Sequence, residues 1–221
     1  MKAACIGHME LRNLAFHTQG QGQRMRRRPM IVMFLTLALL ASCAHQASES
    51  SGRIVRISPD LTLTLPRPGD LSQSLEASQL VTARYGAQSF AFEGHISATP
   101  ERFLMIGLDS LGRRTMTITW TESAITYEAA SWLPAQLRPE NILADMVLLY
   151  WPELSVRSAL APSGGAVTVS PGRRIISRND QPVVVIEYEA GDDGSSWSGR
   201  LRYRNLAFNY EMDVQSIRAN P

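Results

Sequence analysis

The sequence has little of what most catalytic and metal-binding sites need. Of its two cysteines, Cys5 lies in a segment that we expect to be removed, so no disulfide and no cysteine metal site can form. Of its four histidines, only His45 and His95 follow Cys43. The chain also lacks a glycine-rich phosphate loop, a metal-spaced cluster of carboxylates and histidines, and a G-x-S-x-G nucleophile elbow. We therefore predict no metal, no cofactor and no enzyme activity.

Two isolated polar residues need an interpretation. His95, in the strand-like stretch "FEGHIS", would have to serve any Ser/His/Asp site, but no motif surrounds it, which favours an ordinary strand residue. Asp145 lies within an apolar helical stretch. Because charged groups are rarely buried without a partner, a solvent-facing or backbone-bonding role is favoured over a site role. The sequence alone leaves both roles open.

Positive charge is scarce in the part of the chain that should fold. Six of the 22 lysines and arginines and one of the 20 acidic residues precede Cys43, which leaves 16 cations against 19 anions. The net charge of that part is about −3. Binding to nucleic acid would require a basic face on the folded part, so we expect no nucleic-acid partner.

Long hydrophobic runs are also missing. The apolar run from Met30 to Ala41 follows three arginines at 26–28. It is shorter than the ~20 residues of a spanning helix and is typical of an export signal. Its end, "LASC", resembles the lipobox of bacterial lipoproteins, which implies that Cys43 becomes a diacylated N-terminus. A signal of normal proportions would begin at Met25, where we expect translation to start.

These features divide the chain into three regions. We assign residues 1–42 to a leader and signal peptide, residues 43–58 to the lipidated cysteine and a tether, and residues 59–221 to one folded domain. The small, polar composition of Ala44–Gly52 favours a flexible tether. By resemblance to bacterial lipoproteins, the absence of an aspartate at Ala44 implies sorting to the outer membrane.

Alternation of apolar and polar residues predicts a domain rich in β-strands. The predicted strands form a meander and a second group, at 78–85, 88–97, 102–108, 114–120 and 124–129, then 166–169, 173–177, 182–189, 197–204 and 207–218. The third strand has apolar residues on both faces, so both should be covered. In the last strand, Phe208, Tyr210 and Met212 should face inward.

Charged residues on the last two predicted strands should face outward. There, arginines of the earlier strand can oppose Glu211 and Asp213 across the hairpin. These arginines are Arg200, Arg202 and Arg204. Their expected role is solubility and strand register, because exposed ion pairs contribute little to stability.

Two helices are predicted between the strand groups. The stretch "RPENILADMVLLYWP" predicts a helix from Glu140 to Trp151, with Pro139 in its first turn and Pro152 after its end. Its apolar side chains cover more than one face, so it must pack on an apolar surface. A second, weaker helix from Glu153 to Leu160 follows.

This order of elements on a cysteine-anchored chain resembles the LolA and LolB lipoprotein carriers. It resembles more closely an outer-membrane lipoprotein family of unknown function that is often found near aryl polyene biosynthesis genes. The stretches "GLDSLGRRTMTITW", "ENILADMVLLYWP" and "LAFNYEMDVQSI" carry this resemblance. It implies a mainly β fold with a few helices (α+β), a half-open antiparallel β-barrel whose helices form a lid over an apolar cavity.

The resemblance also implies which residues line the cavity or form its lid. These candidates are Phe90, Phe92, Met116, Trp120, Ile142, Met146, Leu149, Tyr150, Phe208, Tyr210 and Met212. Periodicity alone cannot distinguish a lined cavity from a solid core, because both need apolar residues on one face.

The turn "DSLGRR" is a second candidate site. Leu111 stands where LolB-like proteins place an apolar loop residue that contacts the membrane, and Arg113 and Arg114 could meet anionic head groups. Alternatively, Leu111 folds back onto the core of its own hairpin.

The resulting hypothesis is a lipid-anchored carrier or acceptor on the periplasmic face of the outer membrane. It would bind lipoprotein acyl chains or an aryl polyene lipid, and its partners would be outer-membrane lipid, that cargo and a periplasmic carrier protein. The alternative is a structural or assembly lipoprotein that binds a protein partner, and the third possibility is a hydrolase or acyltransferase. A large cavity would favour the carrier, and a filled barrel with an exposed apolar edge would favour the partner-binding protein.

Overall fold

The computed structural model describes residues 46–50, 53–133, 137–191 and 194–219. The expected leader and signal peptide and Cys43 lie outside these ranges. The elements described below all belong to one compact unit, His45–Pro221. Within the described residues, no helix has the length and apolar character needed to cross a membrane.

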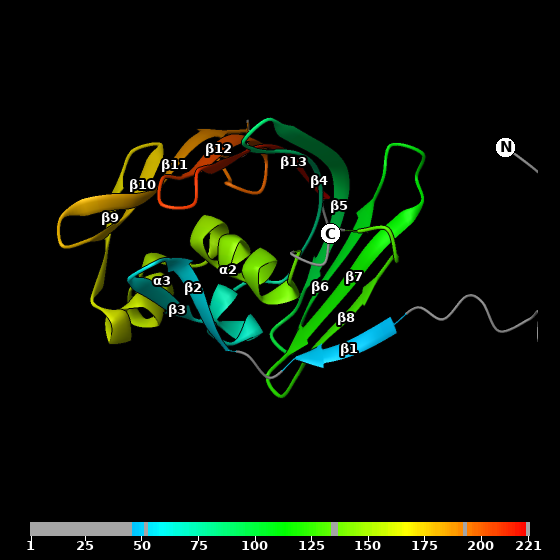
Figure 1. Ribbon diagram of the computed structural model, residues 1–221, viewed down its shortest axis with the longest axis horizontal. Helices are drawn as coiled ribbons and strands as arrows, with labels where there is room; N and C mark the ends of the chain where they lie inside the picture. Colours follow the sequence, from blue (N-terminus) through cyan, green and yellow to red (C-terminus); the bar gives the residue numbers. More distant parts are fainter. Residues whose placement is uncertain (1–45, 51–52, 134–136, 192–193, 220–221) are drawn as a thin grey trace, which may run out of the picture. The chain divides into compact units, whose positions relative to one another are not determined.

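An 11-stranded antiparallel sheet makes up most of the domain (Figure 1). Its strands are β1 (Gln46–Ser50), β4 (Leu75–Tyr85), β5 (Gln88–Ala98), β6 (Arg102–Leu108), β7 (Arg114–Thr121), β8 (Ile125–Ala129), β9 (Gly165–Ser170), β10 (Arg173–Arg178), β11 (Gln181–Ala190), β12 (Gly199–Asn205) and β13 (Tyr210–Ala219). Their spatial order is β1-β8-β7-β6-β5-β4-β13-β12-β11-β10-β9. Strands β1 and β9 do not pair with each other, so the barrel is open, as expected.

A second, two-stranded sheet starts the domain earlier than the expected boundary at residue 59. Residues 54–58, which we had assigned to the tether, form β2 (Ile54–Ser58), which pairs with β3 (Leu61–Thr64). Val55 and Ile57 are buried in the core. The alternation of apolar residues in this stretch was a valid strand signal.

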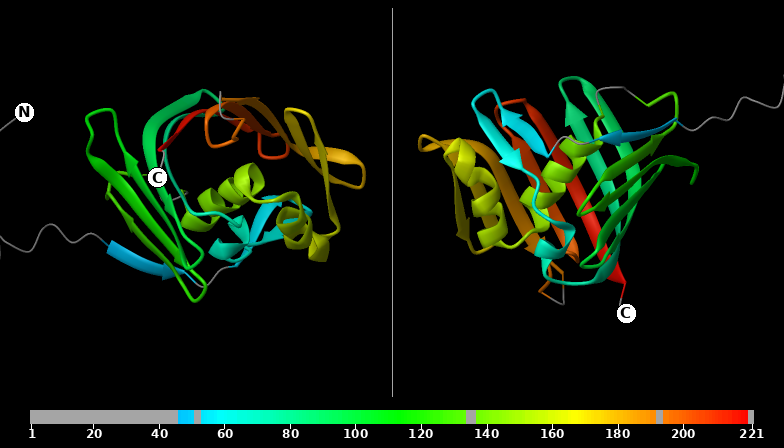
Figure 2. Two further views of the ribbon diagram at one scale, coloured as in Figure 1. Left: turned by 180° about the vertical axis from the view of Figure 1, so that it is seen from behind. Right: turned by 90° about the horizontal axis from the view of Figure 1, so that it is seen from below.

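The helix α2 (Pro139–Tyr150) lies on the concave face of the large sheet (Figures 1 and 2). The hairpin β2–β3 and the helix α3 (Glu153–Leu160) lie beside it, and two short 3-10 helices, η1 (Pro68–Leu71) and η2 (Ala161–Ser163), complete the fold. Nine of the twelve residues of α2 are buried. The helix is therefore a central element of the core and not a lid with a solvent-facing side.

The core is densely filled with aromatic side chains where α2 ends. The ring of Trp151 lies 5.4 Å from that of Trp120 and 5.7 Å from that of Phe103. Tyr150 stacks on Trp197 at 3.8 Å, and its hydroxyl accepts a hydrogen bond from Gln79 (2.6 Å). This part of the barrel is a solid core.

The outer, convex face of the sheet is less covered than the sequence suggested. In β6, Phe103 and Met105 are buried, but Leu104, Ile106 and Leu108 are only partly buried. The prediction that both faces of this strand are covered is wrong, because α2, α3 and the β2–β3 hairpin all lie on the concave side.

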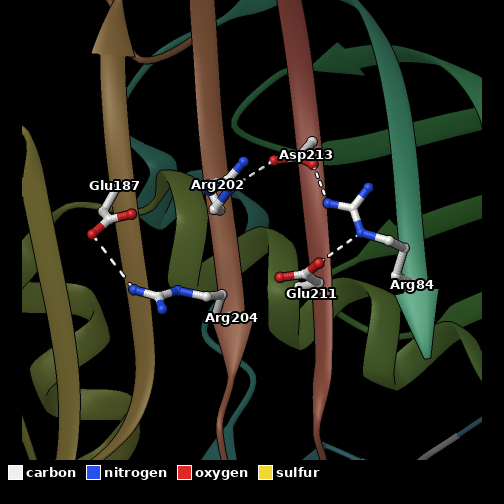
Figure 3. A network of polar contacts seen from close by, with 6 residues as sticks. All are labelled: Arg84, Glu187, Arg202, Arg204, Glu211 and Asp213. Atoms are coloured by element: carbon white, nitrogen blue, oxygen red, sulfur yellow. Dashed lines mark hydrogen bonds and ion pairs between the residues drawn. The ribbon is translucent and has the colours of Figure 1, made fainter. Parts of the chain in front are cut away.

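A ladder of charges crosses the outer face (Figure 3). Its six residues are Arg84, Glu187, Arg202, Arg204, Glu211 and Asp213. The predicted pairing of Arg202 with Asp213 is confirmed at 3.0 Å, whereas Arg204 faces Glu187 of β11 (3.5 Å). Arg84 of β4 joins the ladder and pairs with Glu211 and Asp213. Because these side chains are half exposed, water screens the pairs and the ladder mainly sets strand register.

Candidate functional site

One end of the large sheet is defined by the alternation of its antiparallel strands. The β4–β5 turn (86–87), the β6–β7 turn (109–113), the β12–β13 turn (206–209) and the last residue of β8, Ala129, all lie at the same end. We call this the open end, and Figure 2 shows the β4–β5 turn there. The β7–β8 turn (122–124) lies at the opposite end.

Exposed apolar side chains gather at the open end. Six of the twelve large apolar side chains that are exposed in the described residues lie there: Tyr85, Phe90, Leu111, Trp132, Leu206 and Phe208. We call these six the apolar rim. A concentration of this kind marks an interaction surface, because single exposed apolar residues are normally scattered.

Inside the rim, strand pairing brings apolar side chains together on the inner face of the sheet. Phe90 of β5 and Met212 of β13 both pair with Ala83 of β4, so they belong to one row across three strands. Phe92, one step further in, pairs with Val81. Phe92 and Met212 pack against the core but remain only partly buried. This inner lining is therefore apolar and only partly covered.

The middle of α2 is held over this lining by a carboxylate–tyrosine cluster. The hydroxyl groups of Tyr203 and Tyr210 donate hydrogen bonds to Oδ1 of Asp145, at 2.7 and 2.6 Å. The two hydroxyls lie 3.1 Å apart. On the helix, the partly buried Ile142 lies one turn before Asp145, and the buried Met146 follows it.

The C-terminal end of α2 is held differently. Arg174 donates to the carbonyl of Leu148 (2.7 Å), and the hydroxyl of Tyr188 donates to the carbonyl of Leu149 (2.8 Å). The last carbonyls of a helix have no partner within the helix, so side chains of β10 and β11 satisfy them here. These bonds do not involve Asp145, so two separate sets of hydrogen bonds fix α2 to the sheet.

The charge state of Asp145 is set by its surroundings. Burial raises its pKa to about 6, and the hydrogen bonds from Tyr210 and Tyr203, which favour the carboxylate, partly oppose that rise. Burial, followed by the Asp145 charge, raises the pKa of Tyr203 and Tyr210, so both hydroxyls remain donors. The favoured interpretation of Asp145 as solvent-facing or backbone-bonding is wrong, because two tyrosines are its partners.

We expect Asp145 to make stability depend on pH. Its pKa is about 6 in the folded protein against an ordinary 3.8, so the folded state binds the proton more tightly than the unfolded chain. Stability should therefore fall as pH rises from about 4 to 6, by up to about 3 kcal/mol. Urea unfolding at pH 4 and 7 should show wild type losing stability relative to Asp145→Asn. Parallel changes in the two proteins would contradict this assignment.

The predicted cavity and lid residues fall into two groups. Those near the open end are Phe90, Phe92, Met116, Ile142, Met146, Tyr210 and Met212. Trp120, Leu149 and Tyr150 lie instead in the filled core. Phe208, expected to face inward from a strand, lies in the β12–β13 turn, because Asn209 takes a φ of +53° that ends the pairing.

Sequence reasoning missed other residues of the open end. Tyr203 was not among the candidates, although it alternates with outward arginines of the same strand and must therefore face inward. Tyr85 is the last residue of β4, Leu206 lies in the β12–β13 turn, and Trp132 lies in a connection. Their gathering into one rim depends on strand order, which leaves no local signal in the sequence.

The turn that carries Leu111 is built by Asp109. The carboxylate of Asp109 accepts hydrogen bonds from the backbone N–H groups of Leu111 (2.9 Å) and Arg113 (3.0 Å), and it pairs with the Arg113 guanidinium (2.7 Å). The bond from Arg113 is the main reason that the pKa of Asp109 is lowered. Gly112 supplies the φ of +73° that the turn needs. Leu111 is 74% exposed, so it does not fold back onto the hairpin.

His95 lies on the outer face of the sheet, away from the open end's inner lining. Its Nδ1 is 3.1 Å from Oγ of Ser78, and its Nε2 is 3.0 Å from Glu93. Strands β4 and β5 pair on both sides, so their backbone N–H groups are used within the sheet. The described residues hold no group of three metal-ligating side chains.

A groove of about 450 Å³ lies on the outer face beside the charge ladder. Charged side chains dominate its lining, among them Glu187, Glu189, Arg200 and Arg202. Such a lining does not suit an acyl chain, because burial of charges without partners is costly. The inner lining at the open end remains the better candidate for an apolar ligand.

Three comparisons with known proteins place this geometry in context. A family model described as "Protein of unknown function (DUF3261)" matches residues 76–218. Among solved structures, the chain is similar to the crystal structure of a LolA superfamily protein from Nitrosomonas europaea, with a TM-score of 0.36 and 9% identity over 70% of this chain and 92% of that chain. At that TM-score the likeness supports no argument about function. No curated protein matches.

Proposed function

The chain belongs to the DUF3261 family, whose function is unknown, so we infer the function of this protein from its own geometry. We propose that it is a lipid-anchored carrier or acceptor of acyl chains in the bacterial outer membrane. The observation that carries this proposal is the inner lining at the open end, which is apolar, only partly buried and bordered by the apolar rim. The proposed cargo is a lipoprotein acyl chain or an aryl polyene lipid, received from a periplasmic carrier protein.

The proposed mechanism is displacement of the N-terminal half of α2. Arg174 and Tyr188 hold the C-terminal end of the helix, and Asp145 in its middle accepts hydrogen bonds from Tyr203 and Tyr210. An acyl chain that slides between the N-terminal half and the sheet replaces helix contacts with its own and gains ~0.8 kcal/mol per buried methylene. Passive exchange with the membrane then needs no chemical step.

Phe90→Asp should weaken acyl-chain binding about tenfold, a cost of ~1.4 kcal/mol, because it puts a charge on the inner lining. Leu80→Asp is the matched control, since Leu80 is 56% exposed on the outer face of the neighbouring strand and Phe90 is 45% exposed. The measurement is a titration of the soluble form that begins at His45 with a fluorescent fatty acid. If wild type binds no fatty acid, the carrier function is wrong.

Leu111→Glu should slow transfer of bound lipid to liposomes without lowering the melting temperature. One leucine in the acyl boundary gains about 1.5 to 3 kcal/mol, and arginines such as Arg113 and Arg114 add ~1 kcal/mol each at anionic head groups. Leu154→Glu on α3 is the control, since Leu154 is 76% exposed and Leu111 74%. Equal transfer rates for both variants would show that the turn carrying Leu111 has no part in lipid transfer.

A second candidate function is an assembly lipoprotein that binds a protein partner. The observation in its favour is the solid aromatic core around Trp120 and Trp151, together with an exposed apolar rim. In that case fatty acids would not bind, and the same rim variants would impair capture of the partner. The Phe90→Asp titration therefore separates the two functions.

A further inference from the structure

Strand β1 determines where the folded domain is attached to its predicted lipid anchor. It pairs antiparallel with β8, with Gln46 opposite Ala129 and Ser50 opposite Ile125 (Figure 1). Because β8 ends at the open end, the first residue of β1 also lies at the open end. Three residue steps separate Gln46 from Cys43, so the connecting chain spans at most about 11 Å.

The apolar rim occupies the same end as this attachment point. Trp132 follows Ala129, the partner of Gln46, by three residues. Ala129 also pairs with Met116 of β7, the strand that begins just after the Leu111 turn. The rim includes tryptophan, tyrosine and leucine side chains, and such side chains favour the interface between lipid and water. The start of β1 and the apolar rim thus lie at the same end of the domain.

We propose that the open end is the membrane-facing surface of this protein, and that the pairing of β1 with β8 holds it against the bilayer. The occupant of the apolar rim is the lipid bilayer to which Cys43 is attached. This inference rests on the acylation of Cys43 in the proposed function, but not on cargo binding. Its consequence is that the inner lining opens toward the membrane, so a chain held there reaches the bilayer without crossing water.

The alternative geometry is a domain that turns freely on its anchor. Residues 43–58 were expected to act as a flexible tether, which would let any surface face the membrane. The described part of that stretch forms β1 and β2 instead. Only three residue steps join Cys43 to Gln46, the first residue of β1. With so short a connection, the domain has little freedom to reorient relative to its lipid anchor.

The test uses the lipidated protein, purified from bacterial membranes and reconstituted into phosphatidylcholine–phosphatidylglycerol vesicles. No cysteine follows Cys43, so one introduced cysteine can be labelled selectively with an environment-sensitive fluorophore. Leu206→Cys reports on the open end and Ser123→Cys on the opposite end. A third protein carries Leu206→Cys and a Gly/Ser insertion of about 20 residues between His45 and Gln46, which frees the anchor from β1.

The expected result is several-fold stronger quenching of the label at 206 than at 123 by lipids that carry a quencher in their acyl chains. The insertion should lower the quenching of the label at 206 to about the level seen at 123, while the protein stays bound to the vesicles. Equal quenching of both labels without the insertion would overturn the proposal and would indicate that the apolar rim binds a protein partner. Unchanged quenching with the insertion would overturn the role of β1. Failure of acylation is recognised separately from the intact mass, and failure of cargo binding from the fatty-acid titration.

Discussion

Trp151→Ala is expected to destabilise the domain by about 3 to 5 kcal/mol. The indole is fully buried, contacts the rings of Trp120 and Phe103, and donates from Nε1 to the carbonyl of Arg67 (3.3 Å). Its removal leaves a cavity at the point where α2 ends against the sheet and breaks the indole's hydrogen bond, while the Arg67 carbonyl still accepts the N–H of Asp70. The free energy of unfolding of domains of this size is about 5 to 15 kcal/mol, so the substitution removes a large part of the total stability.

Trp132→Ala is the matched control for that measurement. Trp132 is exposed on the apolar rim, so its truncation should change the free energy of unfolding by less than about 0.5 kcal/mol. Urea unfolding followed by circular dichroism distinguishes the two variants. If Trp151→Ala is as stable as Trp132→Ala, the aromatic cluster does not hold α2, and the proposed fixed end of the helix is wrong.

Cys43→Ser is expected to move the protein from the membrane fraction to the soluble fraction or to block its processing. Diacylation is the only strong anchor that the sequence predicts, and single exposed side chains of the rim contribute too little to replace it. Intact mass and detergent partitioning measure the change. Cys5→Ser should have no effect, because translation from Met25 is expected to suffice. A water-soluble, unprocessed wild type would contradict the assignment of residues 25–43.

The sequence predicted the elements of this fold because strands and helices leave local periodic signals. The predicted strand 102–108 and the predicted helix 153–160 match β6 and α3 without a shift of boundaries. Residues 54–58 were assigned to the tether because small polar residues precede them, although Val55 and Ile57 already alternate. The small, polar composition of the preceding residues was given more weight than the alternation of apolar and polar residues in 54–58. Counting that alternation predicts the strand.

The sequence by itself determined most of the strands from 78 onward, the two helices and the position of the turn that carries Leu111, since these depend on neighbours along the chain. Only the tertiary structure decided that Asp145 meets Tyr203 and Tyr210, which lie 58 and 65 residues away. It also decided that the barrel is solid at Trp151 and accessible at Phe92. Both outcomes depend on how far α2 reaches across the sheet, and that distance is set by packing between elements that are remote in sequence.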